Sequence, residues 1–184
     1  MTSEVSLATA LQLLIAQLAI FQALLLIASA IHKIAKWQHS QGVLRQFAGV
    51  PVSMAALTLC AAIAGELVAA AGLVLPAYRP MGAILAALLW VVYLGLILRA
   101  IAKDRRDVDC GCSFGSASRP LGAFQITRNA ILVGLAVMVA VVSALIGSVG
   151  AQASQGLGAV ALLLLYAALD QVMSLRPLRR GEAV

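Results

Sequence analysis

The amino-acid sequence predicts an all-α membrane protein, a polytopic bundle of about five transmembrane helices. Hydrophobic residues make up 62% of the 184 positions and charged residues only 11%, whereas soluble domains are nearer half apolar and a quarter charged. Five segments approach or exceed the roughly 20 apolar residues that cross the hydrocarbon core of a bilayer. These predicted helices cover residues 5–31, 52–75, 81–98, 130–149 and 157–175. Residues 1–184 are therefore expected to form a single integral membrane domain, with four spans and one interfacial segment as the alternative.

The first predicted helix is interpreted as a retained span rather than as a signal peptide. Its leader carries Glu4 and no Lys or Arg, and its apolar run is longer than the core of a signal peptide. His32 and Lys33 follow directly, as they would at the end of a span. We expect these two side chains to extend to the lipid headgroups, with a catalytic role as the alternative. The polar stretch 33–46 is then expected to lie at the headgroups as an amphipathic segment.

The second predicted helix carries a ridge of small residues and two polar or reactive side chains. Ala61, Gly65 and Ala69 are spaced four apart and allow close approach of another helix. Cys60 is expected to be a small buried hydrophobe. Glu66 stands near the middle of this helix, where an ionised carboxylate costs at least ~2.5 kcal/mol. Glu66 should therefore be protonated, paired or facing a polar cavity, either as a proton or quinone-headgroup site or as a structural interhelical bond.

The last two predicted helices carry a second set of polar residues near one end. Arg128 and Asn129 directly precede the helix 130–149, and Asp170 lies about one turn inside the end of the helix 157–175. These residues should lie at the same depth. An Arg128–Asp170 pair is expected, with a mainly structural role.

The basic residues are distributed by membrane topology. The net charge is +6 with 13 Lys and Arg, and twelve of the 13 fall on one side of the predicted spans, leaving only Arg79 on the other. This bias places the N-terminus outside and the C-terminus in the cytoplasm. Nucleic-acid binding is not expected, because the basic residues lack interleaved aromatic residues or a recognition helix.

The loop 102–125 contains the sequence Cys110-Gly111-Cys112. Gly111 supplies the unusual backbone angles that a bridge between such close residues requires, and a strained exposed disulfide is prone to thiol exchange. Two alternatives remain open. One is a metal site completed by Asp109 or a partner, although two sulfurs fall short of the usual three or four ligands; the other is a static clip of the loop.

With these residues in view, the chain resembles the methylamine utilisation protein MauE family, which is itself distantly similar to DoxX-like membrane proteins. The residues that carry the resemblance are His32-Lys33, Glu66, the basic run 103–106, Asp109-Cys110-Gly111-Cys112 and Arg128-Asn129. The family more often reads Cys-Gly-Cys-Phe-Gly, whereas Ser113 stands here before Phe114-Gly115.

The resemblance implies a protein of the bacterial inner membrane that supports processing, transport or maturation of the methylamine dehydrogenase beta (small) subunit. That subunit is a disulfide-rich periplasmic polypeptide, and the resemblance also implies a thioredoxin-like partner, MauD. Cys110 and Cys112 would be the catalytic thiols. The candidate supporting residues are His32, Lys33, Asp109, Arg128, Asn129 and Asp170.

One conflict follows from the charge bias, which places the cysteine loop in the cytoplasm while the client is periplasmic. Either thiol equivalents are relayed across the membrane, or the topology is inverted. Two other functions remain open: a non-catalytic assembly or translocation scaffold, and a DoxX-type quinone-linked oxidoreductase with a quinone near Glu66. No cofactor is required by the motifs themselves.

Overall fold

The computed structural model describes residues 2–103, 123–147 and 153–174, and within these ranges it contains helices and no strands. Five of the helices are long and apolar enough to cross a membrane, which confirms the predicted polytopic helix bundle. The elements are α1 (Thr2–Ala35), α2 (Trp37–Ala48), α3 (Val52–Val74), the 3₁₀ turn η1 (Pro76–Tyr78), α4 (Arg79–Ala102), α5 (Ala123–Ile146) and α6 (Ala153–Ser174).

Four of the five spans are longer than the apolar runs that predicted them. Helix α1 continues through His32 and Lys33 to Ala35, and α5 begins at Ala123 instead of residue 130. A hydropathy pattern ends at the first polar side chain, whereas a helix continues as long as its backbone bonds are made. Arg128 and Asn129 consequently lie inside α5. Because α5 begins at Ala123, the predicted loop 102–125 ends earlier than expected. Residues 104–122 of this loop lie outside the described residues.

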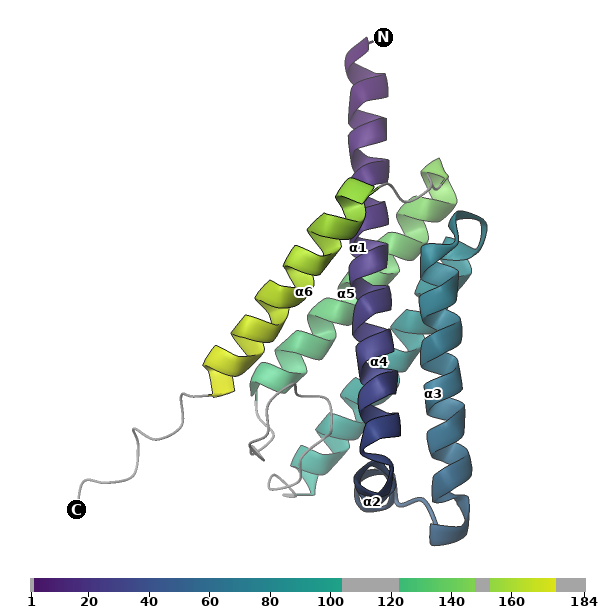
Figure 1. Cartoon of the computed structure of the whole chain (residues 1–184), viewed down its shortest axis with the longest axis vertical. Coiled ribbons are helices and arrows are strands. Elements are labelled where there is room, and N and C mark those ends of the chain that lie inside the picture. Colours follow the sequence, from purple (N-terminus) through teal and green to yellow (C-terminus); the bar gives the residue numbers. More distant parts are fainter. Residues whose placement is uncertain (1, 104–122, 148–152, 175–184) are drawn as a thin grey trace, which may run out of the picture.

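Helix α1 stands at the centre of the bundle, with α3 on one side and α6 on the other (Figure 1). Helix α4 packs against α3 and, most extensively, along α5. The shared core is rich in alanine, including Ala19, Ala69, Ala86 and Ala136, each of which is fully buried. Such small side chains let the helix backbones approach closely, which is how helices associate in lipid.

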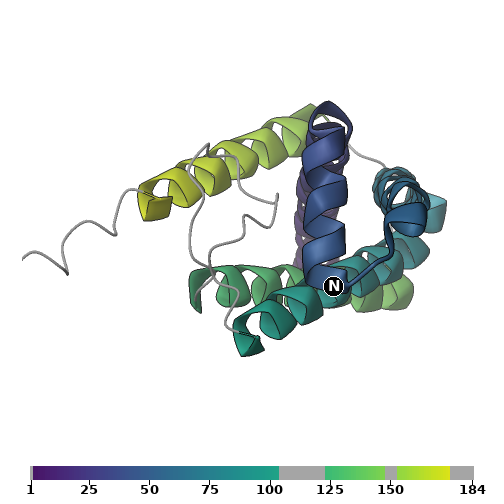
Figure 2. The same cartoon turned by 90° about the horizontal axis from the view of Figure 1, so that it is seen from below.

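Helix α6 is the exception to this packing. In the described residues it packs against α1 but not along α5, and its C-terminal half diverges from the bundle (Figures 1 and 2). Near the start of α6, Gly158 lies close against Gln17 of α1, since a Cβ on that glycine would come 2.6 Å from Gln17 Nε2. The backbone of α6 therefore lies against α1 near its start, and farther along the helix contact with the bundle is made by side chains such as Tyr166 and Asp170.

Helix α2 lies across the end of the bundle, below the last turn of α1 (Figures 1 and 2). Its Trp37 and Leu44 pack against Ala30, Leu59 and Ile63 of α1 and α3. Its opposite face is polar, as expected for an amphipathic segment in the stretch 33–46. The helix ends at Gly49, whose φ of 70° is in the left-handed region that glycine adopts readily.

The other end of the bundle is closed by the contact between α3 and α4. A Cβ on Gly72 would lie 2.8 Å from the Cα of Gly82, so the two backbones touch. Arg79 is fully buried beside this contact, and its Nε donates to the carbonyl of Leu73 at 3.1 Å. The cation thus caps the C-terminus of α3.

The predicted small-residue ridge of α3 is confirmed at Ala69, which is buried, but Ala61 is exposed. Cys60, next to Ala61, is also exposed, so the prediction of a buried cysteine was wrong. Helix α3 is apolar around its whole circumference, and a lipid-facing position has the same composition as a buried one. Composition alone therefore could not assign Cys60 to a face.

Candidate functional site

Glu66 lies at the meeting point of α1, α3 and α4 and is fully buried. Its Oε1 accepts three hydrogen bonds, from Lys33 Nζ at 2.6 Å, Ser29 Oγ at 2.8 Å and Tyr93 OH at 2.6 Å. We call these four residues the Glu66 cluster. Of the three alternatives expected for Glu66 (protonated, paired or facing a polar cavity), the structure shows a paired carboxylate, and its partners come from the two helices that flank α3.

Lys33 reaches this cluster because of the direction in which helical side chains lean. Every Cα–Cβ bond tilts toward the helix N-terminus, so a lysine near the C-terminal end of α1 leans back along the helix. Its Nζ donates to Ser29 Oγ, one turn earlier, at 2.6 Å, and lies 5.0 Å from the centroid of the Tyr93 ring. The expectation that Lys33 extends to the headgroups was therefore wrong. His32 is half-buried and makes none of the three bonds to Glu66 Oε1.

The two oxygens of the Glu66 carboxylate differ. Oε1 takes three donors, whereas Oε2 is buried and has no hydrogen-bond partner among the described residues. A carboxylate oxygen has two lone pairs, and leaving a buried acceptor unpaired costs free energy. Such an oxygen can be satisfied by a proton, a water molecule or a donor from a bound molecule. The roles of Glu66 as a proton or quinone-headgroup site stay predictions.

The polar contacts extend from the Glu66 cluster along α4. The Tyr93 and Trp90 rings meet edge to face with centroids 5.9 Å apart. Trp90 Nε1 donates to Gln22 Oε1 on α1 at 3.2 Å. Both aromatic residues thus pack inside the bundle. They connect the Glu66 cluster to a second buried polar group near the middle of α1.

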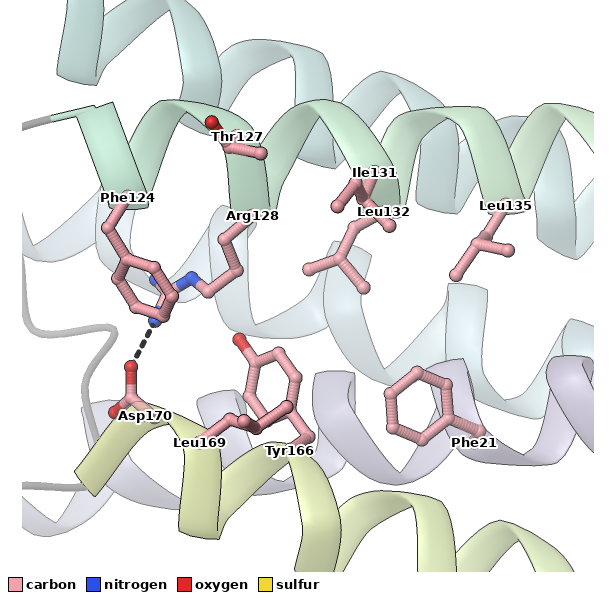
Figure 3. Close-up of a pocket in the computed structure, with 10 residues that line it drawn as sticks. All are labelled: Phe21, Phe124, Thr127, Arg128, Ile131, Leu132, Leu135, Tyr166, Leu169 and Asp170. Atoms are coloured by element: carbon pink, nitrogen blue, oxygen red, sulfur yellow. Dashed lines mark hydrogen bonds and ion pairs between the residues drawn. The ribbon is translucent and has the colours of Figure 1, made fainter. Parts of the chain in front are cut away.

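The predicted pair between α5 and α6 is also present. Arg128 NH1 lies 3.0 Å from Asp170 Oδ1, and both side chains are more than nine-tenths buried. The guanidinium carbon lies 5.9 Å from the centroid of the Tyr166 ring. The pair stands beside a cavity of about 270 Å³ between α1, α5 and α6, which Figure 3 shows with the two side chains facing each other. Asn129 has a different role, since its Nδ2 donates to the carbonyl of Gln125 within α5 at 2.9 Å.

The sequence-predicted thiols Cys110 and Cys112, together with Asp109, lie outside the described residues. The flanking helix ends are described: α4 ends at Ala102 and α5 begins at Ala123, both near the end of the bundle where α2 lies (Figure 1). Among the described residues, no three His, Cys, Asp or Glu side chains gather as metal ligands.

Sequence reasoning missed Lys33, Ser29 and Tyr93 as partners of Glu66. A signal was present in Ser29 and Lys33, which are four residues apart and so lie on one face of α1. Glu66 also needed a cation or donor, because an unpaired carboxylate is costly at membrane depth. Tyr93 had no such signal, because its contact with Glu66 depends on how α3 and α4 pack.

The fold and these buried pairs define a class: a multi-pass membrane protein whose helices enclose ionisable groups within the bundle. The comparisons with known proteins then identify its family. The model of the family "Methylamine utilisation protein MauE" matches residues 11–142, so the chain belongs to the MauE family. Family membership implies an accessory role in methylamine utilisation. The matched segment includes the whole Glu66 cluster, and Asp170 and α6 follow it.

Two curated relatives carry the same description. The methylamine utilization protein MauE of Paracoccus denitrificans is 29% identical over 123 residues, 67% of this chain and 66% of that protein. The chain thus spans just under two thirds of that relative. The methylamine utilization protein MauE of Methylophilus methylotrophus is 29% identical over 154 residues, 82% of this chain and 81% of that protein. No solved structure matches the chain.

Proposed function

We propose that the protein acts in the bacterial inner membrane as a thiol–disulfide exchange factor for maturation of the methylamine dehydrogenase small subunit. The observation that carries this proposal is Cys110-Gly111-Cys112 in a chain that belongs to a methylamine utilisation family. A pair separated by one glycine closes a small strained ring when oxidised, and strained exposed disulfides exchange readily. Its partner would be a thioredoxin-like protein of the MauD type.

The chemical step is an exchange of one disulfide for another. A thiolate of the partner attacks one sulfur of the Cys110–Cys112 disulfide, and the other sulfur leaves as a thiolate. The partner's second thiol then resolves the mixed disulfide, so that the partner gains a disulfide and Cys110 and Cys112 become thiols. The extensive α4–α5 contact supports this function, because it gives the connection between these helices two fixed ends.

Cysteine substitution tests the proposal. Cys110→Ser and Cys112→Ser should each abolish active dehydrogenase while the membrane protein remains at wild-type abundance. One of the two single variants should also trap a mixed disulfide with the partner, visible on a non-reducing gel. Cys60→Ser is the matched control, because Cys60 is exposed on α3. Normal small-subunit disulfides in the Cys110→Ser, Cys112→Ser double variant would overturn the mechanism.

A scaffold is the second candidate, and the Glu66 cluster favours it. The cluster ties α1, α3 and α4 together through one buried carboxylate, which suits a rigid platform for a partner. In that case the double cysteine variant would still co-purify with the small subunit or its thioredoxin-like partner, and no mixed disulfide would be trapped.

The side of the membrane on which exchange occurs is tested by labelling. In a Cys60→Ala, Cys112→Ser background, Cys110 is the only thiol in the chain. A membrane-impermeant maleimide applied to right-side-out vesicles should leave Cys110 unlabelled if the charge bias sets the topology. Inside-out vesicles should then be labelled fully, and the opposite pattern would show the inverted orientation.

A further inference from the structure

The cavity beside the Arg128–Asp170 pair lies where α6 leaves the bundle. Its volume is about 270 Å³, and in the described residues α5 and α6 do not pack along each other. Ile131 of α5 and Leu169 of α6 line it and are 56% and 53% exposed. The cavity therefore borders the surface that faces lipid, and a molecule from the bilayer can reach it sideways.

The surface that this cavity presents to a ligand is entirely apolar. Three polar side chains of its lining are bonded within the protein: Arg128 NH1 donates to Asp170 Oδ1 at 3.0 Å, and Thr127 Oγ1 donates to the carbonyl of Ala123 at 2.9 Å. While the ion pair is closed, a water molecule would lack the two to four polar partners that buried water needs. Apolar cavities bind hydrocarbon instead, because hydrocarbon gains dispersion contacts with their walls.

The length of the cavity matches one leaflet of a bilayer. Its lining on α5 extends from Phe124 to Leu135, a rise of about 16 Å at 1.5 Å per residue. Half of a hydrocarbon core of about 30 Å has nearly the same depth. The ion pair lies at one end of the cavity, and Phe21 and Leu135 lie toward the other (Figure 3). Phe21 is the middle residue of the α1 span Leu7–Ala35, so the cavity leads from the end of the bundle to the middle of the membrane.

We infer that this cavity binds one acyl chain of a phospholipid from the leaflet on the α2 side of the bundle. The chain fits by composition, because the cavity wall is apolar, and by length, because it would run from the ion pair to the middle of the bilayer. A partner helix of that length would need on the order of 1,200 Å³ at a diameter of about 10 Å, several times the space present. The headgroup would stay outside, among neighbouring lipids. The bound chain would fill the gap between α5 and α6, so that lipid joins α6 to the bundle.

Phospholipids that carry a photoreactive diazirine on one acyl chain test the site, with the full-length protein in lipid nanodiscs. Phe21 and Leu132 are the diagnostic positions, because they line the cavity and are only 7% and 3% exposed. A diazirine at the methyl end of the chain should label Phe21, and one near the carboxyl end should label Phe124. Lipid around the protein labels exposed positions such as Val137 whether or not the cavity is filled. Adducts confined to exposed positions, with none on Phe21 or Leu132, would overturn the inference.

A matched pair of substitutions on α5 tests whether the labelling depends on the cavity. Ile131→Trp places an indole at the cavity, whereas Val137→Trp places one outside its lining. The two positions are 56% and 48% exposed, so both substitutions face lipid and should leave the fold intact. We expect labelling of Leu132 to fall about tenfold or more in Ile131→Trp, because the indole takes up the space of the chain. Labelling should be unchanged in Val137→Trp, and equal labelling in the two variants would overturn the inference.

The natural occupant is identified by native mass spectrometry of the protein released from membranes. A phospholipid mass retained by the wild type and lost from Ile131→Trp supports the inference. A free fatty acid or a polypeptide in its place would overturn it. The Cys110→Ser, Cys112→Ser variant should retain the lipid as the wild type does, because the site consists of described residues alone and does not depend on thiol exchange.

Discussion

Two buried ion pairs in the described part of the chain have similar chemistry and different surroundings. Lys33–Glu66 lies between three helices, and one carboxylate oxygen takes three donors at 2.6 to 2.8 Å. Arg128–Asp170 joins α5 to α6 at 3.0 Å beside a cavity of about 270 Å³. The first pair is enclosed by neighbouring helices, whereas the second spans two helices that do not pack along each other.

This difference indicates which half of the bundle is fixed and which can admit a ligand. A buried charge that is fully enclosed depends on its partner, because nothing else is present to solvate it. A charge beside open space can be solvated again by water or by a bound molecule. We therefore regard the Glu66 cluster as structural support and the α5–α6 side as the place for binding.

The largest expected effect comes from Lys33→Ala. Removing one partner of an enclosed pair leaves an uncompensated charge, which typically costs about 3–5 kcal/mol in the free energy of unfolding. The loss should appear in SDS-titration unfolding in mixed micelles, followed by tryptophan fluorescence. Lys36→Ala, at an exposed position near the same end of α1, is the control. The double variant Lys33→Met, Glu66→Leu should recover most of the loss, because replacing both charges removes the desolvation cost.

Arg128→Ala should cost less, about 1–3 kcal/mol. Asp170 would lose its partner, but it lies near the C-terminal end of the apolar span of α6, where desolvation of the carboxylate is smaller than at the middle of a span. The same unfolding assay measures this loss. The comparison between the two ion pairs holds if Arg128→Ala loses less free energy of unfolding than Lys33→Ala. A loss equal to that of Lys33→Ala would show that the α5–α6 pair is as enclosed as the Glu66 cluster.

Tyr93→Phe should have the smallest effect, about 0.5–1.5 kcal/mol. It removes one of the three donors to Glu66 Oε1 and keeps the aromatic ring that Lys33 approaches. Tyr78→Phe provides the matched control, since Tyr78 is 62% exposed in the turn η1. If both variants unfold with the wild-type free energy, the Tyr93 hydroxyl does not stabilise the cluster.

The spans and the Arg128–Asp170 pair could be predicted from the sequence because both depend on local patterns. Apolar length fixes a span, and two opposite charges at the same distance from adjacent helix ends are expected to meet. The partner of Glu66 could not be predicted in this way. Helix α2 lies across the end of the bundle beneath α1 (Figure 1). The last turn of α1 therefore lies beside a later part of α3 than the order of the helices in the sequence suggests. Lys33 consequently faces the middle of α3 rather than its first turn.

The cysteine motif illustrates the opposite case. Cys110 and Cys112 were identified by residue type and spacing alone, and they lie outside the described residues. Cys60 was assigned to the interior and is exposed, because in lipid both faces of a helix are apolar. A reactive motif can be recognised from the sequence alone. Which side of an apolar helix faces lipid can be assigned only when the neighbouring helices are known.

Because Cys60 is exposed on α3, a label attached to it can report how deeply the bundle is immersed in the bilayer. Cys60 lies on α3 eight residues after Val52, a rise of about 12 Å at 1.5 Å per residue. A nitroxide attached there would sit among acyl chains, and its collision rates with oxygen and with a water-soluble nickel chelate would give its immersion. That single measurement would fix how far the cytoplasmic or periplasmic boundary lies from the start of α3.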